Sequence, residues 1–481
     1  MTSGMPRSAG AALLAIATAH LAATTAAAQP GQGGNPLRQF IAVDTSVVAL
    51  TNVRVIDGTG AAARPNHTVV LRDGNILALG DAGTVPIPAG ALVMNLAGKS
   101  VIPGLVMVHE HLYYPSGGGT YGNLSESFTR LYLAGGVTSM RTGGNLNGYG
   151  EIAIKYAIDS GLKVGPWIDA TAPYLEGRGA FSGQMYELKD APDARRMVNF
   201  WADAGATSFK AYMNITRDHL RAAIDEVHRR GLRITGHLCS VTYREAAEMG
   251  IDNLEHSFFA ASDFVPNKQP DSCPGQNDVF QSIYAVDTAG APYKALVRTL
   301  VDRRVALTST LPIFETFVPG RPLPPGLDVL IPALRETYEA RHARLAQQGS
   351  SGYSLLYPKV AAMEVSFFRA GGMLLAGTDP TGSGGVIAGF SNQRAIELLV
   401  EAGLTPVEAI QVCTLNGARY LGRDARVGSI EVGKQADLVI VDGDPTVNVS
   451  DIAKVELVFK NGVGFDPRSL IESVRGRVGI F

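Results

Sequence analysis

The pattern of apolar and polar positions divides the chain into two β-rich ends and a long α/β middle. The β-rich segments are residues 47–56, 68–78, 436–441 and 455–460. Asp73-Gly74 is a turn dipeptide, and Asn461-Gly462 is a strong hairpin signal because both positions tolerate positive φ. Two β-rich segments on either side of the middle predict one small β-sandwich domain built from both chain ends.

The middle of the chain alternates short apolar runs with helical patterns. The clearest helix covers residues 217–230, where Leu220, Ile224 and Val227 share one face and Gly231 follows the last turn. Eight βα repeats favour a (β/α)8 TIM barrel in the α/β class over an open doubly wound sheet. The eight strand candidates are residues 100–108, 136–141, 164–170, 207–211, 232–236, 251–254, 305–310 and 373–377.

These patterns predict the domain organisation. The barrel would cover residues 101–423, and the sandwich would combine residues 29–100 with residues 424–481. Residues 258–300 and 312–360 are longer than βα loops need to be, so we expect them to form the pocket at the catalytic face.

The first 28 residues have the pattern of a signal peptide. Arg7 precedes an apolar run over residues 11–23, and three alanines ending at Ala28 supply the small residues of a cleavage site. Polar residues interrupt the run, which makes a membrane-spanning helix the weaker interpretation. The sequence therefore predicts an exported protein, periplasmic or secreted, with no membrane attachment after cleavage.

Charge and cysteine content narrow the function classes. With 42 Lys and Arg against 44 Asp and Glu, the net charge of −2 provides no basic field for nucleic acid. The three cysteines, Cys239, Cys273 and Cys413, show no spacing typical of a disulfide scaffold or a thiolate metal site, which favours buried thiols. An exported compartment would still permit one disulfide.

Polar residues recur where the predicted parallel strands end. In a barrel the carboxyl ends of the strands share one face, where catalytic groups converge. Four of the nine histidines lie at such positions. The full set consists of His109, His111, Lys210, His237, His256 and Asp379.

The types and spacing of these residues point to a metal centre. His109 and His111 are two apart in a strand, so both imidazoles project to one side and Glu110 to the other. Lys210 stands in an otherwise apolar strand, where an unpaired lysine is costly. Taken singly, His237 and His256 are compatible with ordinary core histidines, but that interpretation does not explain why all six share one end of different strands.

Several motifs resemble the amidohydrolase superfamily, in particular its imidazolonepropionase-like and Xaa-Pro-dipeptidase-like branch. The resemblance covers nearly the whole chain after the first 28 residues. The matching motifs are VIPGL at 101–105, HEH at 109–111, GGVT at 135–138, SFK at 208–210, TGH at 235–237, NLEH at 253–256, AGTD at 376–379, EAGLTP at 401–406, GSI at 428–430 and GKQADLV at 433–439.

The resemblance implies a site with two divalent metal ions. It assigns one metal to His109, His111 and Asp379 and the other to His237 and His256. It also implies that Lys210, carboxylated by CO2, bridges the two as a carbamate. Imidazole and oxygen ligands suit Zn²⁺ best, although they do not exclude Mn²⁺, Co²⁺ or Fe²⁺.

The resemblance also implies the chemistry. A hydroxide bridging the metals would attack an acyl carbon, Asp379 would carry the proton to the leaving group, and Tyr212 is a candidate donor to the oxyanion. Tyr113, Tyr174, Arg178 and Phe181 are candidate specificity residues. The chain lacks the histidine that some peptidase-like relatives carry after the third strand, and this puts dipeptide specificity in question.

We therefore expect a metal-dependent hydrolase that cleaves an amide bond in a small peptide-like or N-acyl amino acid substrate. An esterase or lactonase and a deaminase-type hydrolase of cyclic imides are the alternatives on the same site. An inactive binding scaffold is a more distant one. The sequence leaves the oligomeric state open, with a homo-oligomer among the options.

Overall fold

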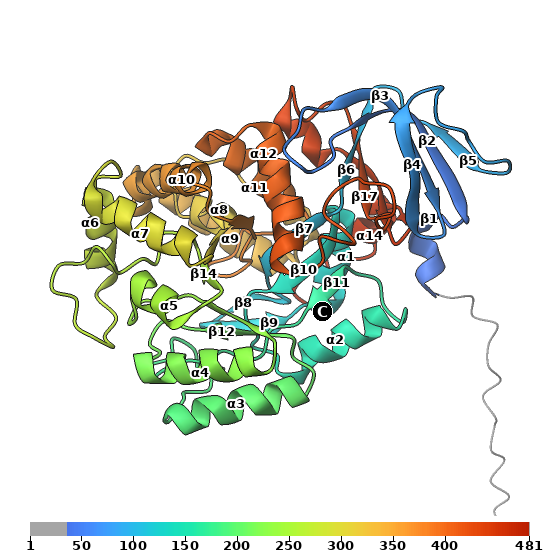
Figure 1. Ribbon diagram of the computed structural model, residues 1–481. Coiled ribbons are helices and arrows are strands. Elements are labelled where there is room, and N and C mark those ends of the chain that lie inside the picture. Colours follow the sequence, from blue (N-terminus) through green and yellow to red (C-terminus); the bar gives the residue numbers. More distant parts are fainter. Residues whose placement is uncertain (1–35, 481) are drawn as a thin grey trace, which may run out of the picture.

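The computed structural model describes residues 36–480, in which a large β-sheet lies beside a larger α/β part (Figure 1). The predicted signal peptide, residues 1–28, lies outside the described residues. Over residues 36–480, no helix has both the length and the apolar character needed to cross a bilayer.

Strands from both ends of the chain form one nine-stranded sheet, in the order β1-β19-β18-β17-β6-β2-β3-β4 with β5 paired to β2. The predicted joining of the two ends is thus present, but a sandwich of two packed sheets is not confirmed by this topology. The strands are β1 (Ile41–Val43), β2 (Val47–Val55), β3 (Arg64–Arg72), β4 (Asn75–Asp81), β5 (Leu92–Asn95), β6 (Lys99–Pro103), β17 (Leu438–Asp442), β18 (Val455–Lys460) and β19 (Val463–Phe465).

Two-residue turns connect neighbouring strands in this sheet. Asp73 and Gly74 have φ of 48° and 81°, and Asn461 and Gly462 have φ of 52° and 78°. Two successive residues with positive φ match the twist of antiparallel strands, so the hairpin predicted at Asn461-Gly462 is confirmed. The segment predicted as β-rich over residues 68–78 lies in a hairpin of β3 and β4, with the predicted turn dipeptide Asp73-Gly74 at its turn.

The α/β part contains eight parallel strands in two sheets, ordered β11-β10-β7 and β12-β13-β14-β15-β16. The strand predicted over residues 100–108 is interrupted at Gly104, where a Cβ atom would lie 2.2 Å from Thr138 Oγ1. Its first half is β6 of the nine-stranded sheet. The parallel strands are β7 (Leu105–Glu110), β10 (Val137–Thr142), β11 (Trp167–Asp169), β12 (Ser208–Ala211), β13 (Arg233–Gly236), β14 (Asn253–Glu255), β15 (Ala306–Ser309) and β16 (Leu374–Ala376).

The strand ladders do not close into one ring, but bonds join the two sheets at both edges. An isolated parallel bridge pairs Thr171, just after β11, with Ser208 of β12. At the other edge the amides of Thr378 and Asp379 donate to the carbonyl of His109, at 3.1 and 3.2 Å. The mixed α/β class is confirmed, and the carboxyl ends of β7 and β16 lie together.

Helices follow the parallel strands in the predicted alternation, and the helix predicted over residues 217–230 is confirmed as α4. The elements outside the two sheet systems are α1 (Ser125–Ala134), α2 (Tyr149–Asp159), α3 (Ala191–Asp203), α4 (Arg217–Arg229), α5 (Tyr243–Met249), α6 (Gln276–Ala285), α7 (Ala291–Asp302), α8 (Leu311–Glu315), α9 (Pro332–Gln348), α10 (Tyr353–Arg369), α11 (Phe390–Ala402), α12 (Pro406–Gln411), α13 (Gly417–Tyr420), α14 (Pro467–Glu472) and the hairpin β8 (Tyr113–Gly117) and β9 (Thr120–Asn123).

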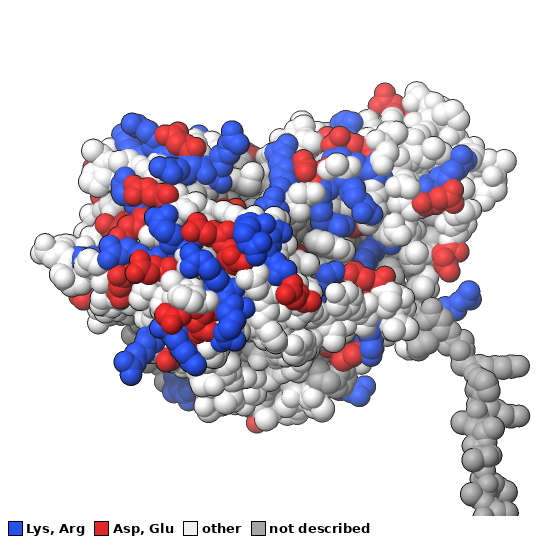
Figure 2. All heavy atoms as spheres, turned by 60° about the horizontal axis from the view of Figure 1, so that its bottom comes forward, with Lys and Arg blue, Asp and Glu red and all other residues white. Residues whose placement is uncertain are grey.

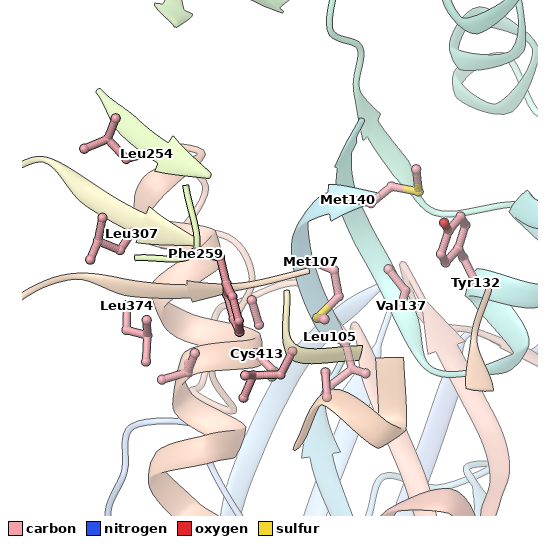
Figure 3. Close-up of a cluster of buried hydrophobic side chains, with 14 of the residues drawn as sticks. Leu105, Met107, Tyr132, Val137, Met140, Leu254, Phe259, Leu307, Leu374 and Cys413 are labelled. Atoms are coloured by element: carbon pink, nitrogen blue, oxygen red, sulfur yellow. The ribbon is translucent and has the colours of Figure 1, made fainter. Parts of the chain in front are cut away.

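Apolar side chains in register across neighbouring strands build the main core. Leu254, Leu307 and Leu374 stand opposite one another on β14, β15 and β16, and all three are fully buried (Figure 3). Since each buried leucine contributes about 2 kcal/mol, this layer fixes the register of the strands that carry the polar residues at their ends.

The surface carries both signs of charge. Figure 2 shows lysines and arginines interspersed with acidic side chains over the visible face. Salt bridges such as that of Arg394 with Glu397, 2.6 Å, pair many of them. No single-sign field covers this face, which fits the net charge of −2.

Candidate metal centre

The parallel strands carry all six predicted ligand residues to the same end of the sheets. His109 belongs to β7 and His111 follows it directly, while Lys210 belongs to β12. The other three come after strand ends: His237 after β13, His256 after β14 and Asp379 shortly after β16. Each residue is more than nine-tenths buried except His237, which is half-buried and lines the cavity described below.

His109, His111 and Asp379 form a compact cluster with room for a cation. One ligand atom from each lies within 4.8 Å of the other two. Asp379 Oδ1 is 3.1 Å from His111 Nε2 and 3.7 Å from His109 Nε2. His109 Nε2 is buried and has no hydrogen-bond partner. A buried nitrogen without a partner is costly, and a metal ion would satisfy it, so these residues fit the metal that the sequence predicts.

Hydrogen bonds on the far side of both imidazoles set their orientation. His109 Nδ1 lies 2.5 Å from Glu255 Oε2, and His111 Nδ1 lies 3.2 Å from the carbonyl of Gly144. When each Nδ1–H donates to these acceptors, each Nε2 presents its lone pair to the space beside Asp379. Such a second partner is typical of histidines that bind metals.

His237 and His256 extend the cluster on the side away from His111. The ring centroids of His256 lie 4.7 Å from His109 and 4.4 Å from His237. Burial lowers the pKa of His237 to about 3 and that of His111 to about 4. Both imidazoles are therefore neutral at physiological pH, the form that binds metal ions.

Lys210 lies fully buried among these groups. Its Nζ is 5.6 Å from the ring centre of Tyr174 and 5.7 Å from that of Tyr212. Burial lowers the pKa of Lys210 to about 8, against the opposing attraction of Glu255 and Asp379. A larger fraction of this lysine is thus a neutral, nucleophilic amine than of an exposed one.

Backbone strain coincides with two of these positions. His256 and Asp379 have φ of 62° and 56°, and Ser257 beside His256 has φ of 50°. A non-glycine residue in this region costs roughly 1 kcal/mol or more and persists where the surroundings impose it. Strained residues of this kind cluster at functional sites.

Two buried charged residues support the cluster, and the sequence assigned neither a role. Arg141, fully buried, donates from Nη1 to Glu255 Oε1 at 3.0 Å and from Nη2 to Thr235 Oγ1 at 2.8 Å. Burial opposes ionisation of Glu255, but the charges of its neighbours outweigh burial and hold its pKa well below the ordinary value. The sequence does contain a signal for this role. Glu255 lies in an otherwise apolar strand directly before His256, and a buried carboxylate needs buried partners.

Glu110 points away from this cluster, as its position between the two histidines predicts. Its Oε1 accepts from Asn392 Nδ2 at 2.8 Å, and Oε2 accepts from the hydroxyl of Thr378. Thr378 directly precedes Asp379 in the chain. Its hydrogen bond to Glu110 therefore helps to hold the loop that carries Asp379.

A cavity of about 200 Å³ opens above the cluster, lined by Lys210, His256 and Asp379 among others. Of the predicted specificity residues, three line it, namely Tyr113, Tyr174 and Phe181, whereas Arg178 does not and is exposed. Tyr212 lines the same cavity, with its ring centre 4.9 Å from that of His237.

The sequence favoured three buried thiols and left one disulfide open, and the structure has the disulfide. Cys239 and Cys273 form a disulfide with their Cα atoms 4.9 Å apart, and only Cys413 is a free, buried cysteine. The two partners are 34 residues apart, and the turn of the chain after His256 brings Cys273 back to the end of β13. The spacing of the cysteines in the sequence does not show that the chain brings Cys273 back to this place.

The chain is similar in sequence to known hydrolases and deaminases. The profile described as "Amidohydrolase family" matches residues 361–464. Imidazolonepropionase from Symbiobacterium thermophilum is 25% identical over 400 residues, covering 79% of this chain and 85% of the relative. Adenine deaminase 2 from a Jannaschia species is 38% identical over 73 residues, 15% of this chain and 12% of that protein.

A solved structure shares the fold. A Xaa-Pro dipeptidase with methionine bound in its active site superposes with a TM-score of 0.66 at 17% identity, covering 88% of this chain and all of that one (100%). The match to the amidohydrolase family and the similarity to imidazolonepropionase indicate a hydrolase acting on C–N bonds. The chain is thus similar to imidazolonepropionase in sequence and to a Xaa-Pro dipeptidase in fold, and residues 361–464 match the amidohydrolase family.

Proposed function

We propose that the protein is a binuclear metal-dependent hydrolase that cleaves an amide bond in a peptide-like or N-acyl amino acid substrate. The observation that carries the proposal is the buried Nε2 of His109, which has no hydrogen-bond partner and faces His111 and Asp379. A site for one cation is the arrangement that satisfies all three groups together.

The proposed ligands divide into two sets. His109, His111 and Asp379 would hold one metal, and His237 and His256 the second, with Lys210 as a carbamate between them. When bound, two Zn²⁺ ions would activate water and polarise the scissile carbonyl. The lowered pKa of Lys210 supports the carbamate, because CO2 reacts with the neutral amine.

The side chains of the site divide the remaining work. The amide C–N bond breaks, the acyl carbon takes the hydroxyl of water, and the leaving amine takes a proton. Asp379 is placed to carry that proton, since its carboxylate lines the cavity and lies beside both imidazoles of the first set. The Tyr212 hydroxyl, on the wall of the same cavity, is the proposed donor to the oxyanion.

We also propose that the two parallel sheets form one (β/α)8 barrel, with the nine-stranded sheet of β1 to β6 and β17 to β19 as a second domain. The bridge from Thr171 to Ser208 and the amide bonds to the His109 carbonyl support this, because they link the sheets at both edges. A barrel rim is the usual place for catalytic side chains in this fold.

A deaminase-type reaction on a cyclic amidine is the second candidate, and the local match to adenine deaminase 2 favours it. The metal-activated water would also attack the acyl carbon of an ester or a lactone. A panel of simple amides, dipeptides, lactones and adenine, offered to the metal-loaded enzyme, separates the three classes by the product released.

Metal analysis and the Asp379→Asn variant test the proposal. We expect about two equivalents of transition metal per chain, loss of amidase activity with a chelator, and its return with Zn²⁺. Asp379→Asn should retain much of the metal while kcat falls by about 100-fold or more. A loaded preparation that binds no transition metal would overturn the proposal, and a wild-type kcat in Asp379→Asn would remove this carboxylate as the proton carrier.

A further inference from the structure

A second cavity, of about 310 Å³, adjoins the metal centre on the side of His237 and His256, which line both cavities. Its other walls come from the two long insertions, with Phe259 and Phe280 from the first and Phe314 and Tyr353 from the second. The sequence predicted that these insertions form a pocket. Their side chains make one wall continuous with the candidate catalytic groups.

Aromatic rings dominate this cavity. Phe259 and Phe314 stack with ring centres 3.6 Å apart, and Phe280 meets Tyr353 edge-on at 4.9 Å. Phe314 lies with its ring centre 5.8 Å from that of His256, so the aromatic wall begins at the metal centre itself. Ring pairs at these distances offer faces and edges to a further aromatic group.

The walls of the cavity beyond the two histidines offer no charged side chain to neutralise a charged ligand. None of its lining residues is Asp, Glu, Lys or Arg, and Gln276 is the only amide side chain among them. At the aromatic wall, away from the two histidines, a carboxylate would lose its hydration without gaining a cationic side chain. An uncharged apolar group gains about 25 cal/mol for each Å² that it buries.

The disulfide makes the cavity a preformed one. Cys239 and Cys273 both line it, and Cys273 comes shortly before α6, the helix that carries Phe280. The bond thus ties α6 to the end of β13, which carries His237. A pocket held open in this way binds its ligand without first ordering a loop.

We infer that this cavity is a substrate subsite for an uncharged aromatic group next to the scissile amide bond. The inference rests on the proposed amide hydrolysis and narrows its substrates to aryl-bearing amides. Since a ~150 Å³ apolar cavity already holds benzene, about 310 Å³ accommodates a substituted or bicyclic ring system.

The first experiment compares kcat/KM for acetyl, succinyl and phenylacetyl amides of one common amine, and for the acetyl amides of methylamine and benzylamine. We expect at least one phenyl-bearing substrate to exceed its acetyl or methylamine counterpart by about 10-fold or more, and the succinyl amide to be the poorest. The two series also tell whether the cavity takes the acyl or the amine side. Equal rates for phenyl and methyl groups would overturn the inference while leaving amide hydrolysis in place.

Two variants locate the effect in this cavity. Phe280→Ala should lower the phenyl preference by about 10-fold, whereas the matched variant Phe368→Ala, on α10 outside the cavity, should leave all rates unchanged. Gln276→Arg places a cation in the wall and should raise the relative rate on the succinyl amide. Gln276 is exposed on its outer side, so the exchange is compatible with folding. A phenyl preference that persists in Phe280→Ala would place the aromatic group elsewhere.

A binding measurement separates this inference from the proposed reaction. Saturation-transfer NMR with benzylacetone, a phenyl ketone that cannot be hydrolysed, should show contact of the phenyl protons with the wild type and a weakened signal with Phe280→Ala. If no amide is cleaved but this binding is seen, the subsite stands and the reaction is wrong. If amides are cleaved and the phenyl ring does not bind, the subsite is wrong.

Discussion

At the scale of single residues, Lys210 is the side chain of the site whose burial is most unfavourable in free energy. Its amine is fully buried, and burial lowers its pKa to about 8. A structural lysine would be better replaced by an apolar residue at this position, because unpaired burial of an amine is unfavourable. Packing alone does not explain a buried amine here, whereas a role in binding metal together with Asp379, His237 and His256 would explain it.

We expect Lys210→Ala to abolish the proposed binuclear centre and activity, because the carbamate proposed to join the two sets of ligands can no longer form. Short carboxylic acids such as acetate should restore part of the activity by occupying the vacated space. The exposed Lys294→Ala is the matched control and should behave as the wild type. Full activity of Lys210→Ala without added acid would remove Lys210 from the centre.

Glu255 acts through His109 rather than on the substrate. Glu255→Gln should weaken metal retention by about 10- to 100-fold, since the amide orients the His109 imidazole less strongly than a carboxylate held by Arg141. The measurement is metal affinity by competition with a chelator, and not activity alone. Glu151→Gln, another fully buried glutamate, is the control, and an equal loss in that variant would make the effect one of general stability.

The sequence named the six candidate ligands because strand ends are readable from apolar runs. It did not find the roles of Arg141 and Glu255, because a hydrogen bond between strands β10 and β14 leaves no trace in local spacing. The outward direction of the Glu110 side chain could be predicted from the alternation of side chains along a strand. A residue between two inward-facing histidines faces outward.

At the scale of elements, the loop between β14 and α6 is the part that the sequence left open. Apolar periodicity places α4 correctly, but it cannot show where an irregular segment returns to the sheet. The disulfide supplies that information, as Cys239 and Cys273 close the loop beside the aromatic cavity.

Cys273→Ser should lower the free energy of unfolding by roughly 2–4 kcal/mol, because the bond closes a 34-residue separation that an unfolded chain would otherwise explore freely. Denaturant unfolding of the oxidised wild type, the reduced wild type and the variant measures this. Cys413→Ser leaves the bond intact and serves as control. If reduction leaves the unfolding midpoint unchanged, the bond does not form in the protein.

Helix α10 carries a buried acid whose ionisation opposes folding. Burial raises the pKa of Glu364 from 4.5 to about 8, so the folded protein holds a proton that the unfolded chain has lost. Below about pH 4.5 Glu364 is protonated in both states and the folded protein keeps its full stability with respect to this group. That stability is lost as the pH rises from about 4.5 to about 8. Glu364→Gln should therefore gain stability relative to the wild type between about pH 5 and pH 8, measured by thermal melts. A difference independent of pH would show that Glu364 is not the titrating group.

At the scale of the whole molecule, both chain ends meet in one sheet. The sequence showed that two β-rich ends exist, and the turns at Asp73-Gly74 and Asn461-Gly462 fixed their hairpins. It could not show that the strands pair as a single nine-stranded sheet, because pairing between β2 and β6 or β6 and β17 depends on contacts far apart in the chain.

The disulfide supports export of the protein, because such bonds persist in oxidising compartments. Expression with the intact start of the chain should yield a periplasmic or secreted product whose first residue is Gln29. N-terminal sequencing of that product and assay of the cell fractions test this. A product that stays in the cytoplasm and keeps residues 1–28 would contradict the prediction.

The pairing of β1 with β19 has a consequence for biosynthesis. These two strands lie near opposite ends of the described residues, so a growing polypeptide completes the sheet only after β19 has been made. The edge of β6 stays unpaired until β17 has been made, which leaves an open strand edge on the nascent protein while the whole α/β part is synthesised.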